Sequence, residues 1–401
     1  MLKNRTFTKK DAEKLSFTDN HLIIPDGYTR VKYHFGFYNT NDVQSITIPA
    51  SIRVIEPNAF SSLYDLKSIY VDKNNSSFKI VDGILFSMDG RKLIKCPPKM
   101  GLSSYVLPDG VTSIESGAFG NCEDLESITL PNSLRKIGSS AFLFCGALKR
   151  IDIPASVKKI ENLAIASCSN LTAITIPECV NIDGKVFLHC YNLEEFTVTK
   201  SNSRSKHICT IDGVLFNRDC SVLIDYPIGN KRKSYTIPDG VREIMPGTFE
   251  DAYNLVEIKL PESIERIGHN AFNNCLNLEN VNIPSGVTTI ENLTFYCCRA
   301  LKKIDIPHGV TRIGYQAFSS CDGLSEIIVP DTVTAIELGA FSCCFGLTDI
   351  TIPDSVTDIG YRILSSMNPF TVHCKEGSII HKYAVENDYE FSLITEGKKE
   401  V

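Results

Sequence analysis

The chain has 401 residues, of which 43% are hydrophobic and 22% are charged, and its formal net charge is −6. These values are ordinary for a folded protein, and the acidic balance argues against nucleic-acid binding, which needs a basic stripe. No stretch approaches the roughly 20 apolar residues of a membrane helix, so we expect no membrane insertion.

Residues 1–44 are the least regular part of the chain, and we expect an N-terminal cap with a degenerate first repeat there. The segment Thr8–Leu15 suits a short helix, and Leu22–Pro25 (LIIP) suits the end of a strand. Because this end has no apolar run of the length that a secretory signal needs, we expect a cytoplasmic protein. A cell-surface or secreted location is the alternative.

A repeat of 23 residues fills the region 45–369. Its clearest mark is an Ile-rich run that ends in proline, such as SITIP, RIDIP and NVNIP. The prolines follow one another at steps of 23 from Pro108 to Pro177 and again from Pro238 to Pro353. A fixed period of this length indicates a solenoid, in which each coil packs on its neighbours.

The columns of the repeat give the template LxxIxIPxxVxxIxxxAFxxCxx. The alternating LxxIxI portion predicts a short strand, the proline ends it, and a turn and a second extended piece follow. Phe, Cys and Leu then recur at three-residue spacing, which favours one 3₁₀ or helical turn. We therefore expect an α/β leucine-rich repeat solenoid. It would have short parallel strands on one face and extended and 3₁₀ or helical turns on the other.

Two longer gaps, at about 72–104 and 199–234, interrupt the array. They contain the related segments Val81–Pro97 (VDGILFSMDGRKLIKCP) and Ile211–Pro227 (IDGVLFNRDCSVLIDYP). Each segment predicts a β-hairpin insert, with turns near Ser87–Gly90 and Asn217–Cys220.

The runs IxIPxxVxxIxxxAFxxC, for example Ile151–Cys168 and Ile304–Cys321, closely resemble the BspA-like leucine-rich repeat family. The resemblance covers about residues 45–370 and extends to the hairpin inserts. It implies a closing strand and a capping helix in residues 370–401, with the helix starting near Ser378. It also implies a binding protein, since the family is known mainly for cell-surface or secreted binding proteins.

The sequence predicts no catalytic, cofactor or metal site. The regular column of cysteines suits small buried side chains better than a disulfide ladder, and its spacing matches no zinc motif. The eight histidines share no column. The column cysteines are Cys122, Cys145, Cys168, Cys190, Cys275, Cys298, Cys321 and Cys344.

The strand positions that flank the central Ile are expected to face solvent, and we predict that they form a partner-binding face. They carry interspersed charges of both signs, and aromatic residues are nearly absent apart from Tyr70. The predicted residues are Arg150, Asp152, Glu257, Lys259, Asn280, Asn282, Lys303, Asp305, Glu326 and Asp349.

We therefore predict a non-enzymatic protein–protein interaction scaffold whose partner is a protein. Fold alone is a weak argument for function, so two alternatives stay open. One is an adhesin-like surface protein that binds host or matrix proteins. The other is a carbohydrate-binding module that uses the hairpins, for which Phe216 and Tyr226 are the candidate contacts.

Overall fold

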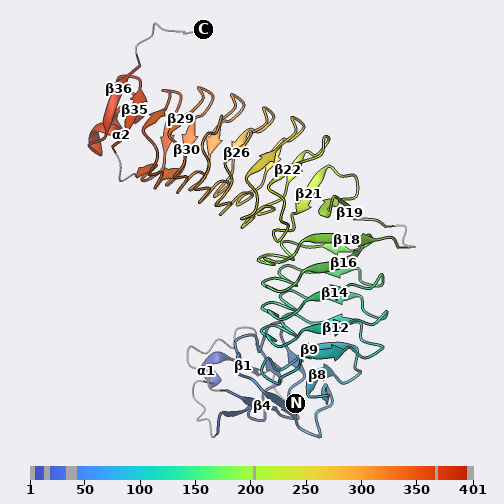
Figure 1. The fold of residues 1–401 in the computed structure, drawn as a ribbon. Coiled ribbons are helices and arrows are strands. Elements are labelled where there is room, and N and C mark those ends of the chain that lie inside the picture. The colour runs from blue at the N-terminus through green and yellow to red at the C-terminus, as the bar shows by residue number, and fades with distance from the viewer. Residues whose placement is uncertain (1–4, 13–18, 33–42, 202–204, 366–368, 395–401) are drawn as a thin grey trace. The chain divides into compact units, whose positions relative to one another are not determined.

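The computed structural model describes residues 5–12, 19–32, 43–201, 205–365 and 369–394 (Figure 1). The chain divides into two compact units, Met1–Gly213 (unit 1) and Val214–Val401 (unit 2). In each unit, coils are stacked so that the strands of successive coils pair in parallel.

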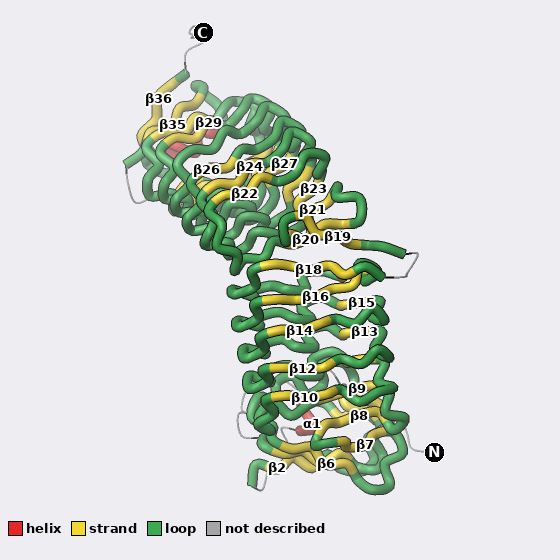
Figure 2. Tube along the Cα trace, turned by 45° about the vertical axis from the view of Figure 1, so that its right-hand side comes forward, coloured by secondary structure: helices red, strands yellow, loops and turns green. Residues whose placement is uncertain are grey.

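The Ile-rich runs form the first side of the coils in unit 1, where parallel strands lie one above another like rungs (Figure 2). In β14 the flanking Arg150 and Asp152 are exposed and Ile151 is buried, because successive side chains of a strand point to opposite faces. The strands of this side are β2 (His21–Ile23), β4 (Ser45–Ile48), β6 (Ser68–Val71), β10 (Ser104–Val106), β12 (Ser127–Thr129), β14 (Arg150–Asp152), β16 (Ala173–Pro177) and β18 (Glu195–Thr199).

The VxxI segments form a second side of shorter parallel strands. One sheet has the order β1-β3-β5, and a larger sheet contains β9, β11, β13, β15 and β17. These strands are β1 (Thr6–Phe7), β3 (Arg30–Val31), β5 (Val54–Ile55), β9 (Lys92–Lys95), β11 (Ser113–Ile114), β13 (Lys136–Ile137), β15 (Lys159–Ile160) and β17 (Asn181–Ile182).

The first insert adds antiparallel strands to this second side. Strand β7 (Phe78–Val81) pairs with β8 (Ile84–Ser87), and β8 pairs with β9, both in antiparallel orientation. In the turn between β8 and β9, the carboxylate of Asp89 accepts hydrogen bonds from Ser87 Oγ and Arg91 N at 2.6 and 3.0 Å. Strand β9 then pairs in parallel with β11, so the insert ends as an ordinary coil strand.

The AFxxC segments form a third side of stacked turns. Within one coil, Cys122 N donates to Phe119 O at 3.0 Å, whereas Phe119 N donates to Ala141 O of the next coil at 2.7 Å. This alternation requires left-handed backbone at intervals, as at Asn121 and Ser140, where φ is 66° and 55°. Because every second N–H group donates its hydrogen bond to the next coil, the segment cannot continue as a helix.

The α/β assignment and the predicted helical turns of the array were therefore wrong. The described residues contain two helices, α1 (Lys9–Ala12) and α2 (Ile379–Glu386), and neither is formed by an AFxxC segment. The fold is a β-solenoid of stacked coils whose third side consists of hydrogen-bonded turns.

Unit 2 repeats this arrangement. Its second insert contains the antiparallel pair β20 (Val214–Asn217) and β21 (Val222–Asp225). The first-side strands are β22 (Ser234–Thr236), β24 (Glu257–Lys259), β26 (Asn280–Val281), β29 (Glu326–Ile328), β32 (Asp349–Thr351) and β35 (Thr371–Cys374). The second-side strands are β23 (Glu243–Ile244), β25 (Arg266–Ile267), β27 (Thr289–Ile290), β28 (Arg312–Ile313), β30 (Ala335–Ile336) and β33 (Asp358–Ile359). On the third side, β31 (Phe341–Ser342) pairs with β34 (Leu364–Ser365).

The two ends of the array carry the helices. Helix α2 begins directly after Ser378, whose Oγ caps it by accepting a hydrogen bond from His381 N at 3.1 Å. It leads to β36 (Glu390–Leu393), which pairs in parallel with β35 and which sequence analysis did not predict. Helix α1 ends at Ala12, and residues 13–15 of the predicted helix Thr8–Leu15 lie outside the described residues.

Two columns fill the core between the three sides. In unit 2 the Phe rings of successive coils stack with centroids 5.2 to 5.6 Å apart. Beside them, each column cysteine of unit 2 donates its thiol to a carbonyl of the preceding coil, as Cys321 does to Phe295 O at 3.1 Å. Valine could fill this space but could not donate this hydrogen bond, so the thiol explains why cysteine recurs here.

Replacing Cys321 by alanine is expected to lower the free energy of unfolding by about 1 kcal/mol at pH 7.5, because the hydrogen bond and a buried sulfur are lost. Burial raises the pKa of the Cys321 thiol well above 9.0. The contribution of the neutral thiol to the free energy of unfolding is therefore complete below pH 9, and it is lost as the pH rises toward the folded-state pKa. Urea titrations of the reduced protein at pH 7.5, 9.5 and 10.5 should show that the difference in the free energy of unfolding between wild type and C321A shrinks as the pH rises.

The variant Cys321→Ser is the matched control, since it keeps a hydrogen-bond donor but has no thiol to ionise. We expect it to be more stable than C321A at pH 7.5 and to show the same pH dependence as C321A. A difference between wild type and C321A that is constant from pH 7.5 to 10.5 would contradict this account.

Candidate interaction surfaces

The predicted partner-binding residues lie on the exposed flanks of the first-side strands. Arg150 and Asp152 belong to unit 1, and the other residues belong to unit 2. Several of them are paired along one strand or segment, and hydrogen bonds from Arg150 hold the pKa of Asp152 below its usual value. The pairs are Arg150–Asp152 (2.9 Å), Lys259–Glu257 (3.5 Å) and Lys303–Asp305 (3.0 Å). Exposed pairs of this kind contribute roughly 0.2–1 kcal/mol each to stability, so they leave the charges available to a partner.

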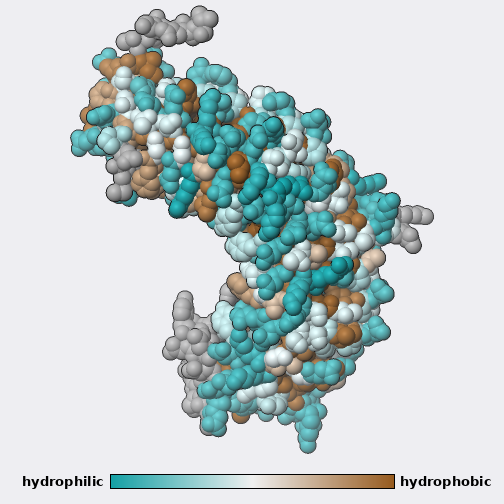
Figure 3. Space-filling view, viewed as in Figure 1, coloured by the Kyte–Doolittle hydropathy of each residue, from teal (hydrophilic) through white to brown (hydrophobic). Residues whose placement is uncertain are grey.

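Two grooves of about 550 and 400 Å³ run across these strands in unit 2. They share Lys303 and Asp305, so they adjoin at this segment. Polar side chains cover much of the face shown in Figure 3, with apolar patches among them. The predicted residues in the grooves are Glu257, Lys259, Asn280, Asn282, Lys303, Asp305 and Glu326.

Asn282 and Asp349 have partners within the fold. The side-chain amide of Asn282 accepts a hydrogen bond from Leu260 N and donates one to Leu260 O, both at 2.8 Å. Asn282 therefore joins two coils where backbone pairing is short. The carboxylate of Asp349 lies 2.9 Å from His373 Nε2, and this hydrogen bond holds the pKa of Asp349 below its usual value.

The grooves lie where the first-side ladder is interrupted. Among the described residues, the segment Lys303–Ile306 forms no strand pair with either β26 or β29. The Phe stack continues through the same coils. The ring centroid of Phe295 lies 5.2 Å from that of Phe272 and 5.3 Å from that of Phe318. The coils thus stay stacked on their third side, while the first-side ladder is interrupted beside the grooves.

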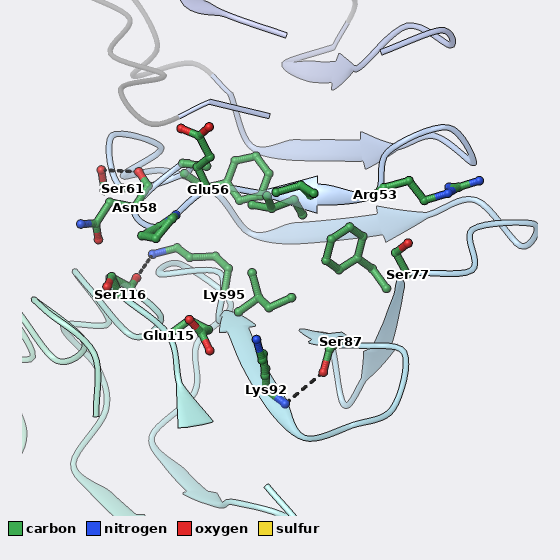
Figure 4. A pocket seen from close by; sticks show the side chains of 18 of the residues that line it. Arg53, Glu56, Asn58, Ser61, Ser77, Ser87, Lys92, Lys95, Glu115 and Ser116 are labelled. Carbon is green, nitrogen blue, oxygen red and sulfur yellow. Dashed lines mark hydrogen bonds between the residues drawn. The ribbon is translucent and has the colours of Figure 1, made fainter. Parts of the chain in front are cut away.

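A third cavity, of about 580 Å³, lies in unit 1 beside the first insert and was not predicted (Figure 4). We call it the β5 cleft, because β5 forms one wall and β9 and the turn after β8 form the other. Lys95 lies in its wall and is buried, and its Nζ donates to Gly117 O and Gly120 O at 3.0 and 3.2 Å. Burial lowers the pKa of the Lys95 ammonium group.

Sequence analysis also missed an exposed apolar strip at the turns of unit 2. Tyr315, Leu338 and Tyr361 occupy the same column in three successive coils, and all three are exposed. Their backbones adjoin, since Gln316 N donates to Leu338 O and Gly339 N donates to Tyr361 O. The sequence signal is an apolar residue eight positions after each of three consecutive prolines.

The side chains that suggested carbohydrate binding lie in the core. Phe216 is 0% exposed and Tyr226 is 2% exposed, so neither can stack on a sugar at the surface. Within the described part of the chain, no helix is long and apolar enough to cross a bilayer. In the same residues no group of three or more His, Cys, Asp or Glu side chains could hold a metal ion.

The model of the BspA type leucine rich repeat region matches the chain in six copies, over residues 5–88, 96–209 and 242–371. The chain belongs to this family. The matched residues begin well before residue 45, in the part of the chain where sequence analysis predicted an N-terminal cap with a degenerate first repeat. The unmatched stretch 89–95 falls within the first insert, and the unmatched stretch 210–241 covers most of the second insert and the residues directly after it.

Solved structures of leucine-rich repeat and related proteins from bacteria have a similar fold. The pneumococcal vaccine antigen PcpA is 24% identical, with a TM-score of 0.62 and coverage of 94% of this chain and 89% of that one. A leucine rich cell surface protein from Faecalibacterium prausnitzii is 24% identical, with a TM-score of 0.54 and coverage of 86% and 88%. A leucine-rich repeat protein from Bacteroides ovatus is 24% identical, with a TM-score of 0.50 and coverage of 94% and 92%. No curated protein sequence matches the chain.

Proposed function

We propose that the chain is a non-enzymatic protein-binding scaffold and that a protein partner binds the two adjoining grooves of unit 2. The observation that carries this proposal is the interrupted ladder at Lys303–Ile306, a segment that lines both grooves among exposed charges. Backbone groups of this segment lack ladder partners among the described residues, so a partner can hydrogen-bond to them as well as to side chains.

The charges in the grooves support a protein partner over a simple polyion. Lys303 and Asp305 lie 3.0 Å apart, and Lys259 and Glu257 lie 3.5 Å apart, so both signs alternate over short distances. Such a pattern selects a partner with matching charges of both signs, and it contributes to association rate and specificity more than to affinity.

Exchanging the two charges of one segment tests the proposal without changing net charge. We expect the double variant Lys303→Asp/Asp305→Lys to bind a captured partner at least tenfold more weakly than wild type, because the order of charges is reversed. The measurement is capture from the native cell by the tagged chain, followed by titration of the purified partner in calorimetry.

The exchange Arg150→Asp/Asp152→Arg in β14 is the matched control, since it reverses an equally exposed pair in unit 1. Binding should be unchanged in this control. A partner that binds the Lys303/Asp305 exchange as tightly as wild type would exclude these grooves as its binding surface.

Location separates two versions of the proposal. A scaffold in the cytoplasm is our prediction, and an adhesin-like protein that binds host or matrix proteins at the cell surface is the alternative. The similar structure from F. prausnitzii is described as a cell surface protein, which gives the alternative a specific basis. Immunodetection in cytoplasmic and surface fractions of the native cell distinguishes the two.

A further inference from the structure

Strand β5 ends its sheet with backbone groups that have no partner among the described residues. On one edge it pairs with β3, where Val54 N donates to Thr29 O at 3.1 Å and Glu56 N donates to Val31 O at 2.9 Å. On the other edge, the carbonyl oxygens of Arg53 and Ile55 accept no hydrogen bond from any described residue. This edge borders the β5 cleft.

A regular coil shows what occupies the equivalent place elsewhere in the same unit. Strand β9 presents its carbonyls to β11, and Arg91 O accepts from Thr112 N at 2.8 Å, while Leu93 O accepts from Glu115 N at 2.9 Å. At β5 the corresponding acceptors are Arg53 O and Ile55 O. The place of the following strand is taken by the cleft, because the insert pairs with β9 and not with β5.

The cleft also has an apolar part that can hold one aliphatic side chain. In regular coils the Ile of this column is fully buried, as Ile114 and Ile137 are, whereas Ile55 is only partly buried. Ile55 lines the cleft together with Phe78 and Ile94. A volume of about 580 Å³ lies within the range of about 300–1,000 Å³ that is typical of ligand pockets.

The rim of the cleft is polar. Arg53 and Lys92 contribute positive charge, and Glu56 and Glu115 contribute negative charge. A segment that fits the cleft therefore has polar side chains on both sides of its aliphatic one.

We propose that an extended segment of another protein adds to β5 as a parallel strand in this cleft. Its N–H groups donate to Arg53 O and Ile55 O, and one aliphatic side chain packs between Ile55 and Phe78. This is strand addition at an exposed sheet edge, in which the backbone gives affinity and a pocket gives specificity. The site lies in unit 1, and it is independent of the grooves proposed above.

The chain itself supplies a probe for the test. Residues Val111–Ser116 (VTSIES) donate to β9 in this register, so a fluorescent peptide of this sequence with blocked ends presents the required donors and an Ile side chain. We expect saturable binding to the full chain in fluorescence polarisation. Hydrogen exchange of the segment Arg53–Glu56 should slow when the peptide is bound.

Two matched controls separate strand addition from other binding. N-methylation of the peptide amide that corresponds to Glu115 removes one donor and should weaken binding at least tenfold. The variant Met88→Trp places a large ring at the rim and should block the peptide. The variant Arg218→Trp changes the equivalent turn residue of the second insert and should bind as wild type does.

The proposal is overturned by any of three results. The first is no saturable binding up to about 1 mM peptide, which corresponds to about −4 kcal/mol. The second is equal affinity for the N-methylated peptide, which would indicate that only side chains are bound. The third is unchanged binding to Met88→Trp while that variant keeps the wild-type unfolding transition.

Discussion

Replacing Phe142 by alanine is expected to lower the free energy of unfolding by about 3–5 kcal/mol, which is the cost of removing a buried aromatic ring. The ring is 0% exposed and stacks on Phe119 with centroids 5.2 Å apart and planes 5° apart. A coil packs on its two neighbours, so a cavity at Phe142 weakens the contact that holds the stack together. Urea unfolding followed by circular dichroism measures the change.

Phe144 provides the control two residues away. It is 50% exposed and takes a left-handed conformation with a φ of 61°, so its side chain points away from the core. We expect Phe144→Ala to change stability by less than about 0.5 kcal/mol, as surface substitutions usually do. If Phe142→Ala and Phe144→Ala lower the free energy of unfolding by similar amounts, the Phe column does not hold the coils together.

The sequence predicted the core columns because burial imposes a strict period. Most coils place an Ile, a Phe and a Cys at the same offset from their proline, and the structure buries Ile137, Phe142 and Cys145 accordingly. The conformation of the third side could not be derived in this way. A Phe, Cys and Leu at three-residue spacing fit both a helical turn and a turn whose alternate N–H groups bond to another coil.

A sequence signal for these turns does exist. The residue before the column cysteine has positive φ in coil after coil, and in some coils it is a residue type that tolerates the left-handed region, such as Asn121 and Asn274. A recurring residue of this kind inside a supposed helix argues against the helix, because it favours turns.

The candidate site was predictable only in part. Period-2 alternation placed the exposed charges correctly on the strand face, as in β14. It could not place the grooves, because the segments KIDIP (Lys303–Pro307) and RIDIP (Arg150–Pro154) share one pattern. Arg150–Asp152 pairs with its neighbours in the ladder, whereas Lys303–Ile306 does not among the described residues. This difference depends on how adjacent coils pack, which a local pattern does not encode.

A two-coil period also went unnoticed in the sequence. The seventh residue after each proline is glycine in every second coil and in most cases glutamate in the coils between. The glycines are Gly138, Gly268, Gly314 and Gly360, and the glutamates are Glu115, Glu161, Glu291 and Glu337. In two coils the glutamate carboxylate reaches back to a backbone N–H just after the glycine, since Glu161 accepts from Ser139 N at 3.2 Å and Glu337 accepts from Tyr315 N at 2.9 Å.

The glycines are needed because the preceding coil approaches closely. A Cβ at Gly138 would lie 2.6 Å from Ser116 N and 2.8 Å from the carbonyl carbon of Glu115. Both atoms are backbone, so the two coils would have to move apart. We expect Gly138→Ala to lower the free energy of unfolding by about 1–3 kcal/mol, which is typical of overpacking.

Gly146 in the same coil is the matched control for this prediction. A Cβ there would meet Ser169 Oγ at 3.5 Å, an ordinary contact. We expect Gly146→Ala to be neutral or to stabilise the chain by about 0.4–1 kcal/mol, since alanine restricts the unfolded state. Urea titrations of both variants measure the difference. If Gly138→Ala is as stable as Gly146→Ala, adjacent coils have room for a side chain here, and the alternation of glycine and glutamate does not arise from coil spacing.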